Sequence, residues 1–269
     1  MEKIDQQQSK KLQSNQIRKI RSILGKKDLK SGMFRKTLRK ADEKDGGGRI
    51  YPTIPLSMMV DLYLRIFLEV VEAVDSIHSY HINHYDLKCA NILLGQKIAQ
   101  RAARTTIYPP LPFIVTVCDF GESALYATEN ESYARVDKGT ECVKSPEMIN
   151  AAKQMHVEAP TYDRRLYVGA DKKSDAWSLG CLLYELVTGY YLFHDGDNGM
   201  FQERIIRQDM DILSGAKRKR LAEADEPRLE DLLRFILQRD PNSRPTIGMI
   251  KIRVVDLLAK RHRARCQNN

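Results

Sequence analysis

Hydrophobic and polar positions alternate with a helical period between residues 57 and 80. The polar positions step forward by three or four residues and form one stripe: Asp61, Arg65, Glu69, Glu72, Asp75 and Ser79. The opposite face is apolar and must be buried: Leu62, Ile66, Val70, Val74 and Ile77. Because this spacing matches 3.6 residues per turn, it predicts a long helix that is capped at Ser57 and buries one face.

Two short apolar runs follow, at residues 92–94 and 113–117, and the segment between them contains three prolines. We interpret the runs as a small antiparallel pair joined by a long loop. A polar, irregular stretch extends from residue 120 to about 147, and helix-like patterns then appear at 175–188, 199–213, 228–238 and 246–260. The predicted fold class is therefore α+β, mainly helical, with one short β-hairpin and no alternating βαβ pattern.

The excess positive charge of the chain lies in its first 50 residues. The 269 residues include 44 Lys and Arg against 35 Asp and Glu, a net charge of +9. Residues 1–50 hold 15 of the basic and 6 of the acidic residues, so the rest of the chain is balanced. A balanced body is not expected to bind nucleic acid. The predicted organisation is a basic, flexible leader at 1–50, a folded domain at 51–262 and a tail at 263–269.

The leader has a second interpretation. Four apolar residues fall on one helical face among basic residues: Leu12, Ile17, Ile20 and Leu24. Such a helix could contact a membrane surface or the groove of a partner protein. A solvated and flexible leader is the simpler interpretation, because short periodicities arise easily in polar sequences.

The composition is typical of a globular protein in a reducing compartment. Hydrophobic residues make up 42% of the chain, which is enough for a sizeable core. The five cysteines are odd in number and contain no Cys-x-x-Cys, so free thiols and an intracellular location, cytoplasmic or nuclear, are expected. The most apolar stretch, residues 54–74, contains four charged residues and is too polar for a transmembrane segment.

The outer ends of the hairpin form the strongest candidate site. The segment 84–91 precedes the first apolar run, and Asp119-Phe120-Gly121 follows the second. A hairpin brings its outer ends together, so four side chains can converge there: Asp86, Lys88, Asn91 and Asp119. Carboxylate and amide oxygens suit Mg²⁺, a lysine can hold a phosphoryl group, and a remaining carboxylate can accept a hydroxyl proton. These residue types predict phosphoryl transfer.

Three other features have both a structural and a functional interpretation. Cys118 could be a reactive thiol, but a small buried residue at a strand end is the preferred interpretation. The basic run 217–220 could be a nuclear-import patch, and we favour a solvated loop there and at 260–265. Three histidines, His78, His81 and His84, are spaced as zinc ligands on a helix would be. Their neighbours favour core packing instead, and His84 is also part of the candidate site.

Five motifs in the same order resemble those of the eukaryotic protein kinases. His84-Tyr85-Asp86-x-Lys88-x-x-Asn91 is similar to the catalytic loop, and Asp119-Phe120-Gly121 is similar to the metal-binding motif. The later motifs are Ser145-Pro146-Glu147, the run Asp-Ala-Trp-Ser-Leu-Gly at 175–180, and Arg239-Asp240-Pro241 with Arg244-Pro245-Thr246. Small-molecule phosphotransferases share the core of the first motif, but they lack the segment that the later motifs mark.

The resemblance implies a role for each matched residue. Asp86 would accept the proton of the substrate hydroxyl, and Lys88 would steady the γ-phosphate of ATP. Asn91 and Asp119 would hold the Mg²⁺ ions. Two structural contacts are also implied, an ion pair of Glu147 with Arg244 and hydrogen bonds from the catalytic-loop backbone to Asp175. Lys88 and the Gly139-Thr140 pair resemble the serine/threonine pattern, which implies a protein substrate with a Ser or Thr acceptor.

The chain also departs from the family in two ways. It contains no Gly-x-Gly-x-x-Gly and no Val-Ala-x-Lys strand, so the resemblance covers the large C-terminal lobe and the N-lobe is missing. We therefore expect a fragment that has little or no kinase activity alone, and the alternative is a catalytically silent scaffold that binds a protein partner. Tyr85 stands where the family commonly has an arginine that meets an activation-segment phosphate, so phosphorylation between residues 119 and 147 is expected to matter less.

Overall fold

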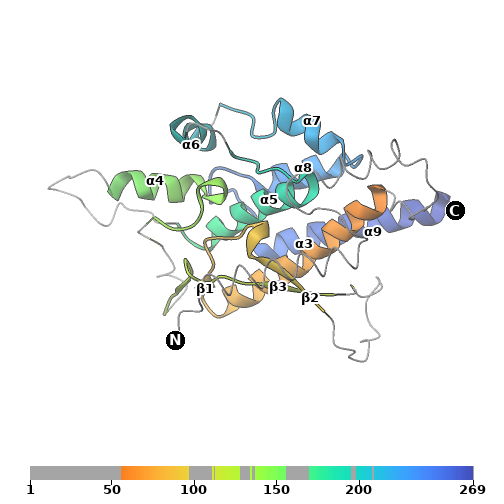
Figure 1. Cartoon of the computed structure of the whole chain (residues 1–269), viewed down its shortest axis with the longest axis horizontal. Helices are drawn as coiled ribbons and strands as arrows, with labels where there is room; N and C mark the ends of the chain where they lie inside the picture. Colours follow the sequence, from red (N-terminus) through yellow and green to blue (C-terminus); the bar gives the residue numbers. More distant parts are fainter. Residues whose placement is uncertain are drawn as a thin grey trace, which may run out of the picture.

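The computed structural model describes residues 56–96, 111, 113–127, 134, 137–155, 170–194, 198–207 and 209–268. In this part of the chain the structure is mainly helical, with short strands in two antiparallel pairs (Figure 1). The helices are α3 (Leu56–Ser79), α4 (Pro146–Met155), α5 (Lys172–Thr188), α6 (Asn198–Ile206), α7 (Ala216–Ala222), α8 (Arg228–Ile236) and α9 (Ile247–Asn268). The strands are β1 (Ile82–Asn83), β2 (Ile92–Gln96), β3 (Phe113–Val117) and β4 (Ala124–Leu125). The predicted basic leader lies outside the described residues.

Helix α5 forms the centre of the core, between α3 and α8. Thirteen of its 17 residues are buried, so it is enclosed on all sides, unlike an amphipathic surface helix. Asp171 caps its first turn by accepting a hydrogen bond from Lys173 N, and Gly189 ends it in the left-handed conformation. A Cβ on Gly180 would lie 2.7 Å from Leu237 Cδ2, so glycine at this position allows α8 to approach closely.

Helix α3 confirms the predicted polar stripe but buries more of its surface than predicted. Glu69, Glu72 and Asp75 are exposed as expected. Of the predicted face, Ile66, Val70 and Val74 are buried, while Leu62 and Ile77 are half-buried. Five further apolar residues are buried: Met59, Val60, Leu64, Phe67 and Val71. The reason is that α3 has neighbours on two sides, because α5 and α9 cover one side while Ile66 packs on Phe113 of β3.

Helices α3 and α9 run side by side (Figure 1). Ion pairs join them, with Arg261 and Arg265 both bound to Asp61 and Lys251 Nζ placed 3.0 Å from Glu72 Oε1. Helix α9 continues through Asn268, so residues 260–265 are helical and the expectation of a solvated loop there is wrong. The predicted domain boundary at residue 262 falls inside this helix.

The strands form two ladders where one was predicted. Strands β2 and β3 pair in antiparallel register with Ile92 opposite Val117, which confirms the predicted hairpin. The second ladder, Ile82 opposite Leu125 in β1 and β4, was not predicted. Each of these strands has only two residues, which is too short to give an alternating pattern.

Two helices of the second half begin or end differently from the prediction. Helix α4 begins at Pro146, at the predicted end of the irregular stretch, but a helix over residues 146–155 was not predicted; proline is suited to the first turn of a helix. The pattern at 199–213 predicted one helix, but α6 ends at Ile206. Arg239 explains this end, because its guanidinium donates to the carbonyls of Arg204 and Ile205 and so caps the last turn.

The basic run 217–220 lies in helix α7, so the expectation of a solvated loop is wrong. Lysine and arginine are good helix formers, and aromatic rings hold the run in place. Lys217 Nζ lies 4.5 Å from the centroid of the Phe193 ring, and the Arg220 guanidinium lies 4.0 Å from that of Tyr190. The basic side chains are therefore partly used in packing α7 against the segment after α5.

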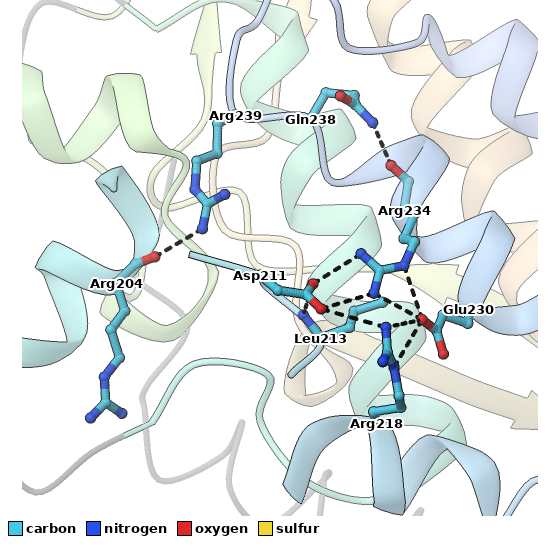
Figure 2. Close-up of polar contacts among 8 residues, drawn as sticks. All are labelled: Arg204, Asp211, Leu213, Arg218, Glu230, Arg234, Gln238 and Arg239. Carbon is cyan, nitrogen blue, oxygen red and sulfur yellow. Dashed lines mark hydrogen bonds and ion pairs between the residues drawn. The ribbon is translucent and has the colours of Figure 1, made fainter. Parts of the chain in front are cut away.

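An ion-pair network joins α7, α8 and the turn at residue 211 (Figure 2). Arg218 and Arg234 each place a guanidinium nitrogen 2.8 Å from the same oxygen of Glu230. Arg234 also donates to both oxygens of Asp211, and this hydrogen bonding is the main reason that the pKa of Asp211 lies below its usual value. Since the groups are partly exposed, each pair contributes only about 1 kcal/mol or less to stability.

The ion pair of Glu147 with Arg244 confirms the first implied contact. The guanidinium is fully buried and donates to both carboxylate oxygens, at 2.7 and 3.0 Å. It also donates to the carbonyls of Lys173, Gln238 and Arg239, so it joins α4, the start of α5 and the segment after α8. A buried arginine with this many acceptors is costly to remove, because its partners lose their donor inside the protein.

We expect Arg244→Met to lower the free energy of unfolding by about 3–5 kcal/mol, because it leaves the Glu147 carboxylate buried without its partner. Urea-induced unfolding followed by circular dichroism measures this change. The matched control is Arg207→Met, which removes an exposed pair with Asp209 and should leave the unfolding midpoint unchanged. Equal effects of the two substitutions would contradict a structural role for the buried pair.

Candidate active site

The backbone of residues 84–86 is held by one buried carboxylate. Asp175, in the first turn of α5, is completely buried and accepts hydrogen bonds of 2.7 Å from the backbone N–H groups of His84 and Tyr85. His78 Nε2 lies 2.8 Å from the same carboxylate. This confirms the contact between Asp175 and the loop that the resemblance implied. A carboxylate in the first turn of a helix is also favoured by the helix dipole.

Asp86 is held by hydrogen bonds to both of its carboxylate oxygens. Lys88 Nζ and Asn91 Nδ2 lie 2.7 and 3.1 Å from Oδ2, and the backbone N–H of Thr140 donates to Oδ1 at 3.0 Å. Asn91 Nδ2 also donates to the carbonyl of Asp86 at 2.8 Å, and Lys88 Nζ donates to Thr140 Oγ1 at 2.5 Å. The structure therefore brings three of the four predicted side chains together in direct contact.

These contacts set the charge state of Asp86. Burial alone would raise its pKa, but the hydrogen bonds from Lys88 and Thr140 outweigh burial, and the pKa lies below its usual value. The carboxylate is therefore ionised at neutral pH. An ionised carboxylate with a fixed orientation is able to accept a hydrogen bond from a hydroxyl group.

The fourth predicted residue, Asp119, lies two residues after the end of β3 and directly follows Cys118, which contacts Asn91. The backbone N–H of Cys118 donates to the carbonyl of Asn91 at 2.9 Å, and the carbonyl of Cys118 lies 3.2 Å from His84 Nε2. Asp119 is exposed and has a φ of 68°, in the left-handed region. The ladder of β2 and β3 places it there, because Ile92 directly follows Asn91 and pairs with Val117.

Comparison with known proteins agrees with this geometry. The sequence profile described as "Protein kinase domain" matches residues 57–253, well over half of the chain. The chain belongs to the protein kinase family. The motifs, the buried ion pair of Glu147 with Arg244 and the Asp175 contacts all lie within the matched region.

Several curated serine/threonine kinases are similar to this kinase chain. A probable serine/threonine-protein kinase of Dictyostelium discoideum is 34% identical over 202 residues, which cover 74% of this chain and 8% of that protein. CBL-interacting protein kinase 11 of Oryza sativa subsp. japonica is 29% identical over 208 residues, covering 76% of this chain and 34% of its own. Nek8 of Danio rerio is 28% identical over 190 residues, covering 71% and 22%. The chain thus spans about a third or less of the length of these relatives.

The donor set at the hairpin ends fits a magnesium ion. The Asn91 amide donates through its nitrogen to Asp86, which leaves its oxygen as an acceptor, and the exposed Asp119 follows Cys118, whose backbone N–H contacts Asn91. Mg²⁺ is usually held by one or two carboxylates together with water and phosphate oxygens, so two protein ligands are sufficient. Among the described residues, no group of three or more His, Cys, Asp and Glu is arranged to hold a metal. This includes the three histidines: the His78 ring contacts Asp175, and the His84 ring contacts the backbone of Cys118 and Asp86.

Cys118 has a structural role in this kinase site. Its thiol is half-buried and donates to the carbonyl of Asn91 at 3.2 Å. Burial, together with the charge of Asp119, raises the pKa of the thiol. Because the thiolate is the nucleophilic form, this cysteine is not activated, and it links the two ends of the hairpin.

Two features of the site were not identified from the sequence. From the sequence, Gly139 indicates only the type of acceptor residue. In the structure its φ is 82°, and a Cβ at this position would lie 2.2 Å from the carbonyl oxygen of Tyr85. It must therefore be glycine for Thr140 to reach Asp86. Glu185 accepts a hydrogen bond from Cys89 N, and burial raises the pKa of its carboxyl. The sequence did contain a signal for Glu185, because it is the one glutamate in the apolar helix pattern at 175–188.

We expect Lys88→Met to raise the pKa of Asp86, because burial then acts with fewer opposing hydrogen bonds. The depressed pKa of Asp86 contributes stability that is fully present above its unfolded value of about 3.9 and is lost as the pH falls through the folded pKa. This contribution should shrink in the variant. A carboxyl ¹³C NMR titration of Asp86 measures the shift, and Lys251→Met, at an exposed pair with Glu72, is the control. An Asp86 titration unchanged by Lys88→Met would contradict this account.

Proposed function

We propose that this chain carries the large helical lobe of a serine/threonine protein kinase domain, which transfers the γ-phosphoryl group of ATP to a Ser or Thr hydroxyl of a protein substrate. The observation that carries the proposal is the Asp86 carboxylate, ionised and held by Lys88, Asn91 and Thr140. Two of the relatives, those of Dictyostelium discoideum and Danio rerio, are named serine/threonine-protein kinases, which supports the same acceptor type.

Asp86 has the properties of a catalytic base for this reaction. Three hydrogen bonds occupy part of its acceptor capacity, and a carboxylate has about four lone-pair positions, so one position remains for the substrate hydroxyl. As the hydroxyl oxygen forms its bond to the γ-phosphorus, its proton passes to Asp86 and the bond to the leaving ADP oxygen breaks.

Lys88, Asn91 and Asp119 complete the proposed chemistry. Lys88 can move its ammonium from Asp86 to a phosphate oxygen over a short distance, because it already lies between the Asp86 and Thr140 oxygens. Asn91 and Asp119 would hold Mg²⁺, which supplies positive charge against the phosphate oxygens when it is bound. The orientation of Asn91 is fixed in advance by its two hydrogen bonds to Asp86.

The second candidate function is a catalytically silent scaffold. The observation that favours it is the lack of a glycine-rich loop and a strand lysine in the 269 residues, because these groups normally cover and anchor the nucleotide phosphates. We propose that the 269 residues therefore need these groups from elsewhere for catalysis. The five free thiols support a reducing intracellular compartment, cytoplasmic or nuclear, for either function. Within the described part of the chain, no helix has the length and apolar character needed to cross a bilayer.

We expect the purified 269-residue chain to transfer little or no phosphate from radiolabelled ATP to protein substrates. A fusion that supplies a kinase small lobe before Tyr51 should transfer phosphate, and Asp86→Asn should lower its rate by at least about a hundredfold through loss of the base. Transfer by the chain alone, abolished by Asp86→Asn, would contradict the need for a small lobe. A folded but inactive fusion would contradict the kinase proposal.

Asp119→Asn separates the two candidate functions. In the kinase it should weaken Mg²⁺-dependent nucleotide binding by the fusion, since the amide is a poorer ligand for a hard cation. A scaffold would bind its partner equally well before and after this substitution. Isothermal titration with ATP, with and without Mg²⁺, measures the first effect, and Asp75→Asn, at an exposed position of α3, is the matched control.

A further inference from the structure

The side chain of Tyr85 is buried beside the candidate base but has no part in the proposed chemistry. It is only 2% exposed and has a φ of 64°, in the left-handed region that bulky side chains rarely adopt. Such a conformation is unfavourable and persists only where the surrounding contacts impose it. The contacts of Tyr85 therefore indicate what the conformation achieves.

The hydroxyl of Tyr85 makes three hydrogen bonds. It donates its single proton to the carbonyl of Ala170 at 2.9 Å, and it accepts from Asn83 Nδ2 at 2.8 Å. The hydroxyl of Tyr126 lies 2.9 Å away and must be the donor of that pair, since the proton of Tyr85 is already used. We call these four residues, Asn83, Tyr85, Tyr126 and Ala170, the Tyr85 clasp.

The Tyr85 clasp joins segments that are far apart in the sequence. Asn83 is in β1, Tyr126 directly follows β4, and Ala170 precedes the cap of α5. Ala170 forms a two-way backbone bridge with Ala134, and the N–H of Tyr126 donates to the carbonyl of His81. Apolar packing also stabilises the Tyr85 clasp, because Tyr85 is buried in one cluster with Ala134, Met148 and Ala170.

The backbone of Tyr85 also contacts the residues between β3 and α4. Its carbonyl oxygen is in close contact with Gly139, and the next residue, Asp86, accepts the N–H of Thr140. The residues between β3 and α4 therefore contact Tyr85 twice, once at its hydroxyl and once beside the candidate base. Hydrogen bonds that hold the Tyr85 hydroxyl therefore also restrict the position of Thr140 relative to Asp86.

We propose that Tyr85 is a positioning residue whose hydroxyl holds the segment between β3 and α4 against the catalytic loop, and so orients Asp86, without any phosphate. All three partners of the hydroxyl are neutral groups, so the clasp needs no charged modification to form. Burial raises the pKa of the Tyr85 hydroxyl far above its usual value, and it remains a neutral donor at physiological pH. The proposal rests on the proposed function only in that Asp86 is the base.

Hydrogen exchange in the full 269-residue chain tests the clasp without any need for catalysis. We expect Tyr85→Phe to speed exchange of the backbone N–H groups of Tyr126, Ala134 and Ala170 about tenfold, because local opening becomes easier. Exchange in α8 should not change. The matched control is Tyr184→Phe, which removes another buried hydroxyl bond, to the carbonyl of Lys217. Equal exchange rates in Tyr85→Phe and the unmodified chain, or acceleration spread evenly over α8, would overturn the clasp.

Two further measurements separate positioning from general stabilisation. Tyr126→Phe should speed the same N–H groups, and the double variant should add little to Tyr85→Phe, since both remove one shared bond. The backbone N–H of Thr140, which donates to Asp86 Oδ1, should also exchange faster in Tyr85→Phe, and its exchange should not change in Tyr184→Phe. Additive exchange effects, or an unchanged exchange rate of the Thr140 N–H, would overturn the positioning role. An inactive fusion with these results intact would refute the kinase function alone.

Discussion

The site depends on a carboxylate that no solvent reaches. Asp175 is completely buried at the start of the central helix α5, and it accepts the N–H groups of His84 and Tyr85 in the loop. Without these bonds, two backbone donors would be buried unpaired and the carboxylate would keep only its contact with His78, which is a costly defect in a protein interior. The loop is therefore fixed by the same residue that fixes the first turn of the core helix, and the orientation of Asp86 follows from the packing of the whole helical body.

A second constraint brings the remaining groups to this loop. The antiparallel register of β2 and β3 places Cys118 next to Asn91, and a backbone hydrogen bond joins the two residues. Asp119, the residue after Cys118, therefore lies at the outer end of the hairpin. Gly139, by allowing close approach to the carbonyl of Tyr85, brings Thr140 to Asp86. The candidate side chains thus follow short strands or lie in the loop before β2, and hydrogen bonds fix the Asp86 carboxylate and the Asn91 amide in place.

Some of this arrangement could be predicted from the sequence. Helix α3, the β2–β3 hairpin and the convergence of Asp86 and Asn91 follow from periodicity and from local pairing. Other parts depend on partners distant in the chain. The end of α6 is set by Arg239, α7 packs on aromatic rings of the segment after α5, and the two residues of β1 pair with β4 through a ladder too short to give a pattern. The family resemblance supplied Glu147 with Arg244 and Asp175, which periodicity alone could not have connected.

The two supports of the catalytic loop differ in kind, and the difference bears on regulation. On one side a carboxyl group, that of Asp175, accepts backbone N–H groups, and on the other side a hydroxyl, that of Tyr85, bonds to neutral partners. An arginine in place of Tyr85 would bring a positive charge into this apolar cluster and would require an anion to balance it. The tyrosine removes that requirement. The contacts of the Tyr85 hydroxyl are then made entirely to neutral groups of the chain itself, at Asn83, Tyr126 and Ala170.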